Sequence, residues 1–304
     1  MPLSETQAEK LLPTVPEEAP MAVRHARQTI CFSLFRIAAL VNGLALAIVV
    51  GFIFKNGWRA ISWTFLTAPP IDSMTRGGIL PCIVGTLALS FSAVLVAVPI
   101  GMASAIYMRE YARPGKLLWL IRLGINNLAG VPSVVFGLFG LAFFVVLMKM
   151  GVSILAGALT LAAMNLPVII GATEEALNAV PDTYREASLG LGATQWQTIR
   201  YVVLPAALPG ILTGGILGVS RAAGETAPIM FTGAVFFTPD LPSSLFDEVM
   251  ALPYHIYVLA TAGTNIEATR HLQYGTAIVL IVLVLGMNFV AILLRWHLRR
   301  KLNL

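Results

Sequence analysis

Charged residues are scarce in this 304-residue chain: they make up 12% of it, against 57% hydrophobic residues. Soluble domains carry about 25% charged residues, so this composition excludes an ordinary soluble protein. We infer an all-α integral membrane protein with the lipid bilayer as its surroundings, because helices satisfy their own backbone hydrogen bonds inside lipid. Once the spans are counted, the length leaves no room for a second large soluble domain.

Residue patterns typical of catalysis, metal binding or nucleotide binding are also missing. Two cysteines, Cys31 and Cys82, cannot form a disulfide framework or a metal cluster. The one Gly-Lys pair, at 115–116, lacks the other residues of a nucleotide-binding P-loop. The four histidines lie apart in tails and links, where we expect surface positions; they are His25, His255, His271 and His297. The sequence therefore predicts no catalytic residue, no metal site, no cofactor and no ATP hydrolysis by this chain, which we do not expect to be an enzyme.

A cleavable signal peptide is not visible in residues 1–29. This segment mixes four glutamates with three basic residues and has no short apolar core before a small-residue cleavage site. We expect it to be a flexible cytoplasmic tail, followed by a membrane domain over 30–300.

Six apolar runs approach or exceed the ~20 residues that a bilayer core requires. They cover about 37–54, 79–108, 126–148, 154–172, 210–236 and 276–294. Helix breaks are expected in the third run at 130–133 and in the fourth at Asn165 and Pro167, as is tolerated where a helix faces a protein-lined cavity. The links at 55–76 and 237–275 are polar, with aromatic residues suited to an interface.

Lysine and arginine residues indicate the orientation of these spans. If the N-terminus is inside, 13 of them fall on inner segments and 5 on outer links. The positive-inside rule then predicts that both termini are cytoplasmic. The net charge of +5 is spread over several loops, which speaks against a nucleic-acid partner.

One polar stretch, over 186–205, interrupts the apolar sequence. Thr183-x-x-Glu186 and Thr194-x-x-Gln197 have the spacing of capping boxes, in which two side chains satisfy free N–H groups at a helix start. The sequence therefore predicts two short helices here.

A glycine separates these two predicted helices. Gly192 precedes the second box, where a positive φ angle can end the first helix. Pro205 is expected to prevent smooth continuation of the second helix. We name the stretch from Thr183 to Pro205 the elbow.

The elbow resembles the EAA loop of the membrane subunits of bacterial ABC importers. The resemblance rests on Glu186-Ala187-Ser188, on Gly192 and on Val202-x-Leu204-Pro205, with Ser188 and Val202 replacing alanine and isoleucine. It implies a six-span, MetI-like type I importer permease fold with a cytoplasmic coupling loop at 174–209. The residues that it implies for coupling to a separate ATPase are Glu186, Ala187, Gly192, Leu204 and Pro205. An amphipathic loop on the membrane surface is the alternative.

Two charges interrupt the fifth predicted span. Arg221 lies about 16 Å into it at ~1.5 Å per residue, near the middle of a ~30 Å core. A charge there costs on the order of 2.5–3.5 kcal/mol, so it should face a bundle interior or a watery cavity. Glu225, four residues on, shares its helix face. The two residues form either part of a substrate pathway or a structural ion pair.

A narrower resemblance includes these charges. Arg221, the following Gly-Glu-Thr-Ala-Pro at 224–228, and Asn-Asn-Leu-Ala-Gly-Val-Pro-Ser-Val-Val-Phe-Gly at 126–137 are similar to the PstA-type permeases of bacterial phosphate importers. The resemblance covers about 30–300 and implies a location in the bacterial inner membrane and a phosphate pathway at Arg221, Glu225 and Thr226. The partners that it implies are two copies of an ATPase, a second, PstC-like permease and an extracytoplasmic phosphate-binding protein.

Two other functions stay open on the residues alone. An arginine suits sulfate or molybdate nearly as well as phosphate. A secondary transporter driven by an ion gradient would show internal repeats, and no clear repeat is visible.

Overall fold

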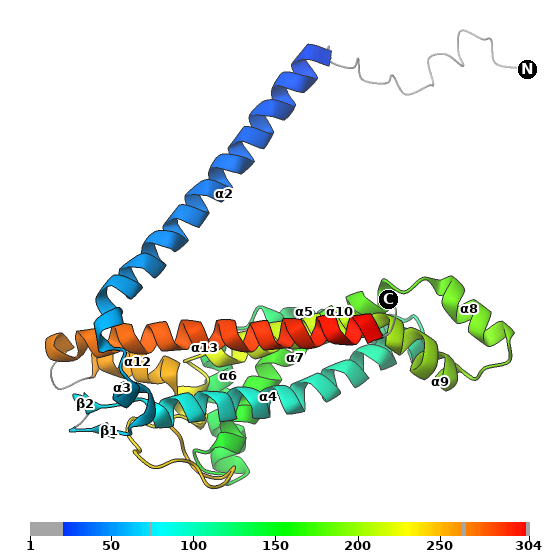
Figure 1. The fold of residues 1–304 in the computed structure, drawn as a ribbon. Coiled ribbons are helices and arrows are strands. Elements are labelled where there is room, and N and C mark those ends of the chain that lie inside the picture. Colours follow the sequence, from blue (N-terminus) through cyan, green and yellow to red (C-terminus); the bar gives the residue numbers. More distant parts are fainter. Residues whose placement is uncertain (1–20, 73, 263–265, 302–304) are drawn as a thin grey trace, which may run out of the picture. The chain divides into compact units, whose positions relative to one another are not determined.

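The structure, a computed structural model, describes residues 21–72, 74–262 and 266–301 of the chain. It divides into two compact units, Met1–Phe52 and Ile53–Leu304. Helix α2 (Met21–Gly57) forms the described part of the first unit and ends in the second (Figure 1). It is long and apolar enough to cross a membrane. Of the tail expected over 1–29, residues 1–20 lie outside the described residues, and α2 begins at Met21.

Short elements follow α2 in the second unit. They are the 3-10 turn η1 (Trp58–Ala60), α3 (Trp63–Thr67) and an antiparallel hairpin of β1 (Pro70–Ile71) and β2 (Arg76–Gly77). The Ser62 hydroxyl begins α3 by accepting the Phe65 N–H at 3.1 Å. The Phe65 ring is buried in a cluster with Cys82 and Met250, so this link packs against the bundle.

Three long helices form the centre of the second unit. They are α4 (Leu80–Ile106), which continues as the π-helical turn η2 (Tyr107–Tyr111), α7 (Ile154–Asn178) and α10 (Leu204–Gly224). Small residues let them approach closely: a Cβ on Gly101 would lie 2.7 Å from the Ile169 side chain, and one on Gly214 would lie 2.6 Å from Ala172. α4 runs parallel to α7, and α10 runs antiparallel to both.

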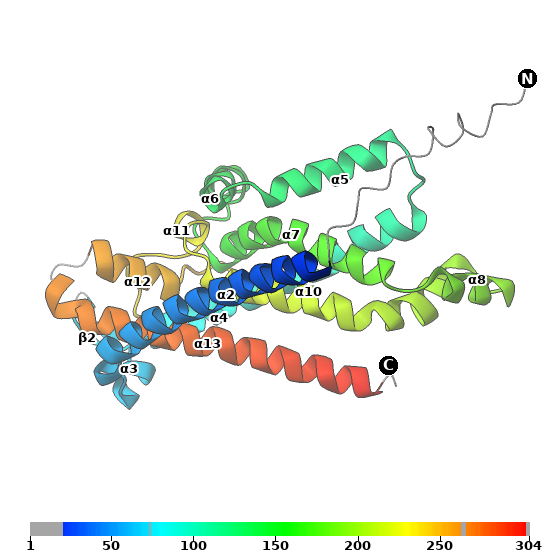
Figure 2. The ribbon, with the colours of Figure 1, turned by 90° about the horizontal axis from the view of Figure 1, so that it is seen from above.

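Two further helices complete the bundle. α13 (Ile266–Lys301) packs along α10 and along the shorter α12 (Leu252–Thr261), as Figures 1 and 2 show. Five described helices are long and apolar enough to cross a membrane, and a sixth span results if one bent pair counts as a single crossing. This agrees with the six spans expected.

The bent pair is the third expected span. α5 (Lys116–Ala129) meets α6 (Ser133–Gly140) and the π-helical η3 (Leu141–Leu147) at an angle of 102°. In Figure 2, α5 is seen along its length and α6 end-on. The break lies where Pro132 takes an extended conformation, as predicted. The helix starts earlier than expected, however, and Arg122 belongs to α5, where it pairs with Glu174 of α7 at 2.5 Å.

The break expected in the fourth span is wrong. α7 is continuous through Asn165 and Pro167, both of which are buried. The Asn165 amide donates to the Leu161 carbonyl at 2.9 Å, and close packing on α4 and α10 supports the helix around the proline.

The fifth expected span, 210–236, is also revised. α10 begins earlier and ends at Gly224, and a separate turn, α11 (Ile229–Thr232), follows. Beyond it, residues 249–252 of the expected polar link belong to the core. The Leu252 N–H donates to the Thr86 hydroxyl at 2.8 Å, and a Cβ on Gly85 would overlap the Met250 carbonyl. This apolar stretch is too short to span a bilayer, so the sequence alone did not separate it from the link.

Candidate functional site

The elbow contains the two expected short helices. They are α8 (Asp182–Gly190) and α9 (Gln195–Thr198), followed by the π-helical turn η4 (Ile199–Val203). Gly192 has φ +85°, as predicted. The second capping box is confirmed: the Gln197 backbone N–H donates to the Thr194 hydroxyl at 3.3 Å, and the Thr194 backbone N–H donates to Oε1 of the Gln197 side chain at 2.8 Å. The glycine turn and the cap set the angle between the two helices.

Two details of the elbow differ from expectation. α8 begins at Asp182 after Pro181, so Thr183 lies inside the first turn and its predicted capping box is wrong. Pro205 does not interrupt the second helix either, because 195–224 form one continuous helix. The π-type turn just before Pro205 compensates for its missing N–H.

The outer side of the elbow is open. Glu186, Ala187 and Gly192 are exposed, whereas Leu204 and Pro205 are half-buried at the base of α10. Apolar side chains are exposed there as well, among them Leu191 and Trp196, and the spacing of the motif did not predict them. Exposed apolar residues in a polar loop are typical of a docking surface.

The second candidate site lies at the other end of α10. Arg221 Nε and Glu225 Oε1 are 3.2 Å apart, so the expected contact is present. The Arg221 side chain is 41% exposed and that of Glu225 18%. The prediction that Glu225 is helical is wrong: α10 ends at Gly224, and Glu225 is the residue after the helix, with its side chain turned back. Thr226 follows, half-buried, and its carbonyl accepts the Met230 N–H that begins α11.

Contacts with α13 give the position of this pair along that helix. The Ser220 hydroxyl contacts the Asn288 amide oxygen, and Arg295 Nη1 donates to the Thr213 hydroxyl at 2.8 Å. These contacts align the two antiparallel helices and set Arg221 about two residues from Leu285, the midpoint of the apolar run 276–294. At ~1.5 Å per residue this is about 3 Å. Arg221 thus lies in the last turn of α10 and not in the middle of a helix as expected, and its depth in a bilayer stays a prediction.

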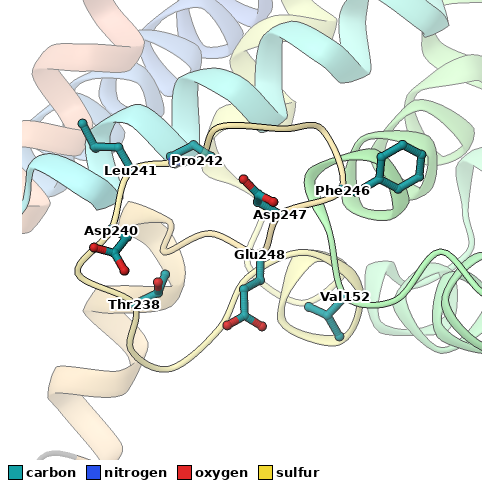
Figure 3. Close-up of a pocket in the computed structure, with 8 residues that line it drawn as sticks. All are labelled: Val152, Thr238, Asp240, Leu241, Pro242, Phe246, Asp247 and Glu248. Atoms are coloured by element: carbon teal, nitrogen blue, oxygen red, sulfur yellow. The ribbon is translucent and has the colours of Figure 1, made fainter.

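A hollow elsewhere on the second unit has the wrong charge for an anion. It measures about 400 Å³ and is formed by the loop before α12 (Figure 3). Three carboxylates lie around it, those of Asp240, Asp247 and Glu248. Hydrogen bonds from the Ser243 backbone N–H and hydroxyl, and from the Ser244 N–H, lower the pKa of Asp247 and keep it ionised. The hollow is therefore acidic.

One histidine differs from expectation. His25, His271 and His297 are exposed, but His255 on α12 is buried. Among the described residues, no group of three histidine, cysteine or acidic residues could hold a metal ion.

Comparison with known proteins gives a family and several relatives. Residues 97–304 match the family described as "Binding-protein-dependent transport system inner membrane component". The chain is 34% identical over 274 residues to the "Probable ABC transporter permease protein YqgI" of Bacillus subtilis (strain 168), covering 86% of this chain and 92% of that protein. It is 33% identical over 287 residues to the "Phosphate transport system permease protein PstA 1" of Mycobacterium tuberculosis (strain ATCC 25618 / H37Rv), covering 92% and 91%.

Solved structures are similar in fold. A chain of the inward-facing MetNI methionine ABC transporter has a TM-score of 0.54 at 20% identity, covering 73% of this chain and 94% of that chain. A chain of a bacterial alginate ABC transporter, solved in complex with a periplasmic protein bound to an alginate pentasaccharide, has a TM-score of 0.59 at 14% identity, covering 94% and 98%. At these identities the likeness concerns the fold alone.

Proposed function

Because this chain belongs to the binding-protein-dependent transport system inner membrane component family, we propose that it conducts phosphate in an ATP-driven importer. The chain is a multi-pass inner-membrane permease component of an ABC transporter and not its ATPase. Its fold is the MetI-like importer fold that the sequence predicts. Family membership also removes the ion-gradient-driven transporter from consideration.

The Arg221–Glu225 pair carries the proposal for phosphate. A guanidinium offers planar, multidentate donors that suit phosphate oxygens, and it stays charged at any working pH. The Arg221 side chain is 41% exposed, so an anion could reach it. The similarity to PstA 1 supports phosphate among the oxyanions.

In our proposal, Glu225 allows the anion to leave Arg221. An arginine that binds an anion too tightly would block passage. The carboxylate at 3.2 Å competes for the guanidinium, so the anion can be attracted and then released. Thr226, next along the chain, contributes to the same pathway in our proposal.

The elbow supports the proposal for coupling. Its exposed outer side, with Glu186, Ala187 and Gly192, would dock on a separate ATPase subunit, of which two copies serve the transporter. Leu204 and Pro205 would pass the motion into α10. The proposal requires the elbow and both termini to be cytoplasmic, in line with the positive-inside rule.

The remaining partners complete the pathway. A second, PstC-like permease would cover the open side of Arg221 and share the pathway. An extracytoplasmic phosphate-binding protein would deliver the anion, as a periplasmic protein accompanies the alginate transporter whose fold is similar.

Uptake by the full complex in liposomes tests the proposal. We expect ATP-dependent uptake of radiolabelled phosphate, and we expect Arg221→Gln to lower it by about tenfold or more, as for the loss of charged hydrogen bonds. Arg295→Gln is the matched control, because Arg295 lies on the same bundle and bonds Thr213 instead, and it should keep uptake. Sulfate and molybdate should compete poorly.

Two results would count against this function. Equal competition by sulfate or molybdate would indicate another oxyanion. Full phosphate uptake by Arg221→Leu/Glu225→Leu, after assembly has been verified, would show that the pair is only structural, because replacing both partners of an ion pair with apolar residues can restore packing.

A further inference from the structure

A buried ion pair joins the elbow to the end of another helix. Arg185 of α8 and Glu110 of η2, at the end of α4, lie 75 positions apart in the sequence. Arg185 Nη2 is 2.8 Å from Glu110 Oε1, and the two side chains are only 11% and 8% exposed. Arginine and glutamate are almost never this buried unless they are paired.

All the N–H donors of the Arg185 guanidinium have hydrogen-bond partners. An arginine has five N–H donors, and here Nε and Nη2 reach the Glu110 carboxylate, Nη2 also reaches the Leu177 carbonyl, and Nη1 reaches the Val180 carbonyl and Asp182. The two carbonyls lie at the last turn of α7 and just beyond it. One side chain thus binds α8, α4 and α7 together.

Glu110 makes a second link to the elbow. Its backbone carbonyl accepts the Gln195 side-chain amide at 2.5 Å, so the residue contacts both α8 and α9. It lies on a π-helical turn, a geometry that often marks functional positions. One buried cluster near this turn contains Met108, Leu177 and Val203.

We propose that Arg185 and Glu110 are positioning residues that form a rigid strut between the elbow and the ends of α4 and α7. The inference rests on the proposed coupling of the elbow to an ATPase. α9 continues directly into α10 and so reaches Arg221 without help. α4 and α7 have no continuous helix to α9, and the strut makes them move with the elbow.

A buried pair suits this task better than the exposed pair beside it. Arg109 and Asp182 join the same two elements at 3.1 Å, but their side chains are 30% and 69% exposed. Exposed pairs are screened by water and contribute little. The strut, with five donors satisfied, holds one geometry.

The test uses the full complex in liposomes and measures phosphate taken up per ATP hydrolysed. Glu110→Gln keeps the size of the side chain and removes its charge, and Arg185→Lys keeps the charge but cannot reach all four partners. We expect each to lower the ratio roughly tenfold, the size of a typical coupling term. Arg109→Gln is the matched control and should change it less than about twofold.

A double variant separates a strut from a merely structural pair. Glu110→Met/Arg185→Met removes both charges, so stability and assembly should recover. The ratio of uptake to hydrolysis should stay low, because two methionines cannot bind the carbonyls of α7 and fix the elbow. A wild-type ratio in this variant would overturn the strut.

The outcome for the strut is distinct from that for the proposed function. If the wild-type complex takes up no phosphate with ATP, the proposed function fails. If the wild type couples and Gly192→Val loses both phosphate uptake and phosphate-stimulated ATPase activity, while the Glu110 and Arg185 variants match the wild type, only the strut is refuted.

Discussion

The buried imidazole of His255 links the packing of the second unit to pH. This side chain on α12 is 4% exposed, and its Nδ1 atom has no hydrogen-bond partner among the described residues. Burial lowers its pKa from 6.5 to about 4. Because the folded protein binds this proton more weakly than the unfolded chain, the stabilisation is complete above pH 6.5 and is lost as the pH falls from about 6.5 towards 4.

We therefore expect the folded protein to be less stable at acidic pH. Lowering the pH from 7.5 to 5 should cost about 2 kcal/mol of stability through His255 alone. Thermal unfolding of the purified protein in detergent at both pH values measures this. His255→Leu, which cannot titrate, should have the flatter pH dependence; equal slopes in the two proteins would contradict the prediction.

At the scale of an element, the elbow depends on one backbone angle. Gly192 has φ +85° and open space around its α-carbon, so a substitution there meets conformational strain rather than a clash. Gly190, two residues earlier, also has open space but lies in α8 and does not have a positive φ angle. The two glycines thus separate the effect of strain from that of bulk.

We expect Gly192→Val to impair ATP hydrolysis and transport together. A β-branched residue pays about 1–2 kcal/mol for the left-handed conformation, which would turn α8 away from α9. Phosphate-stimulated ATPase activity and phosphate uptake in liposomes should fall together, whereas Gly190→Val should keep most of both. Normal coupled activity in Gly192→Val would argue against the role of the elbow.

For the whole molecule, the parallel and antiparallel helices define two ends. α7 leads into the elbow and α10 leads away from it, so the elbow lies at one end of the central bundle. The C-terminal end of α13 lies towards the start of α10, as the Arg295–Thr213 contact shows. The acidic loop that contains Ser243 precedes α12, which packs with the earlier half of α13.

This arrangement predicts opposite labelling at the two ends. In a background of Cys31→Ser and Cys82→Ala, a cysteine at Ser243 should react with a membrane-impermeant reagent from outside the cell. A cysteine at Leu191, which is almost fully exposed on the elbow, should react only from the cytoplasmic side. The reverse pattern would invert the topology and remove the elbow from reach of an ATPase.

Features that depend only on residues close in sequence could be predicted from the sequence. The apolar runs predict the spans because a bilayer demands a minimum length of apolar helix. Gly192 and the Thr194–Gln197 box act on their own neighbours, and the structure contains both as expected. The contact between Arg221 and Glu225 is also present, although Glu225 lies beyond the helix end and not on the shared helix face that the spacing predicts.

Other features depend on residues distant in sequence. The end of α10 at Gly224, the continuity of α7 through Pro167 and the burial of 249–252 depend on what packs against each segment. His255 and Arg185 look like ordinary link and loop residues in the sequence; only folding buries the first and brings the second to Glu110. The sequence by itself determined the membrane class and the elbow, because those depend on short-range hydrophobicity and backbone geometry. Tertiary structure decided where helices stop and which charges are buried, because the free energy of burying a group depends on the neighbours that it meets.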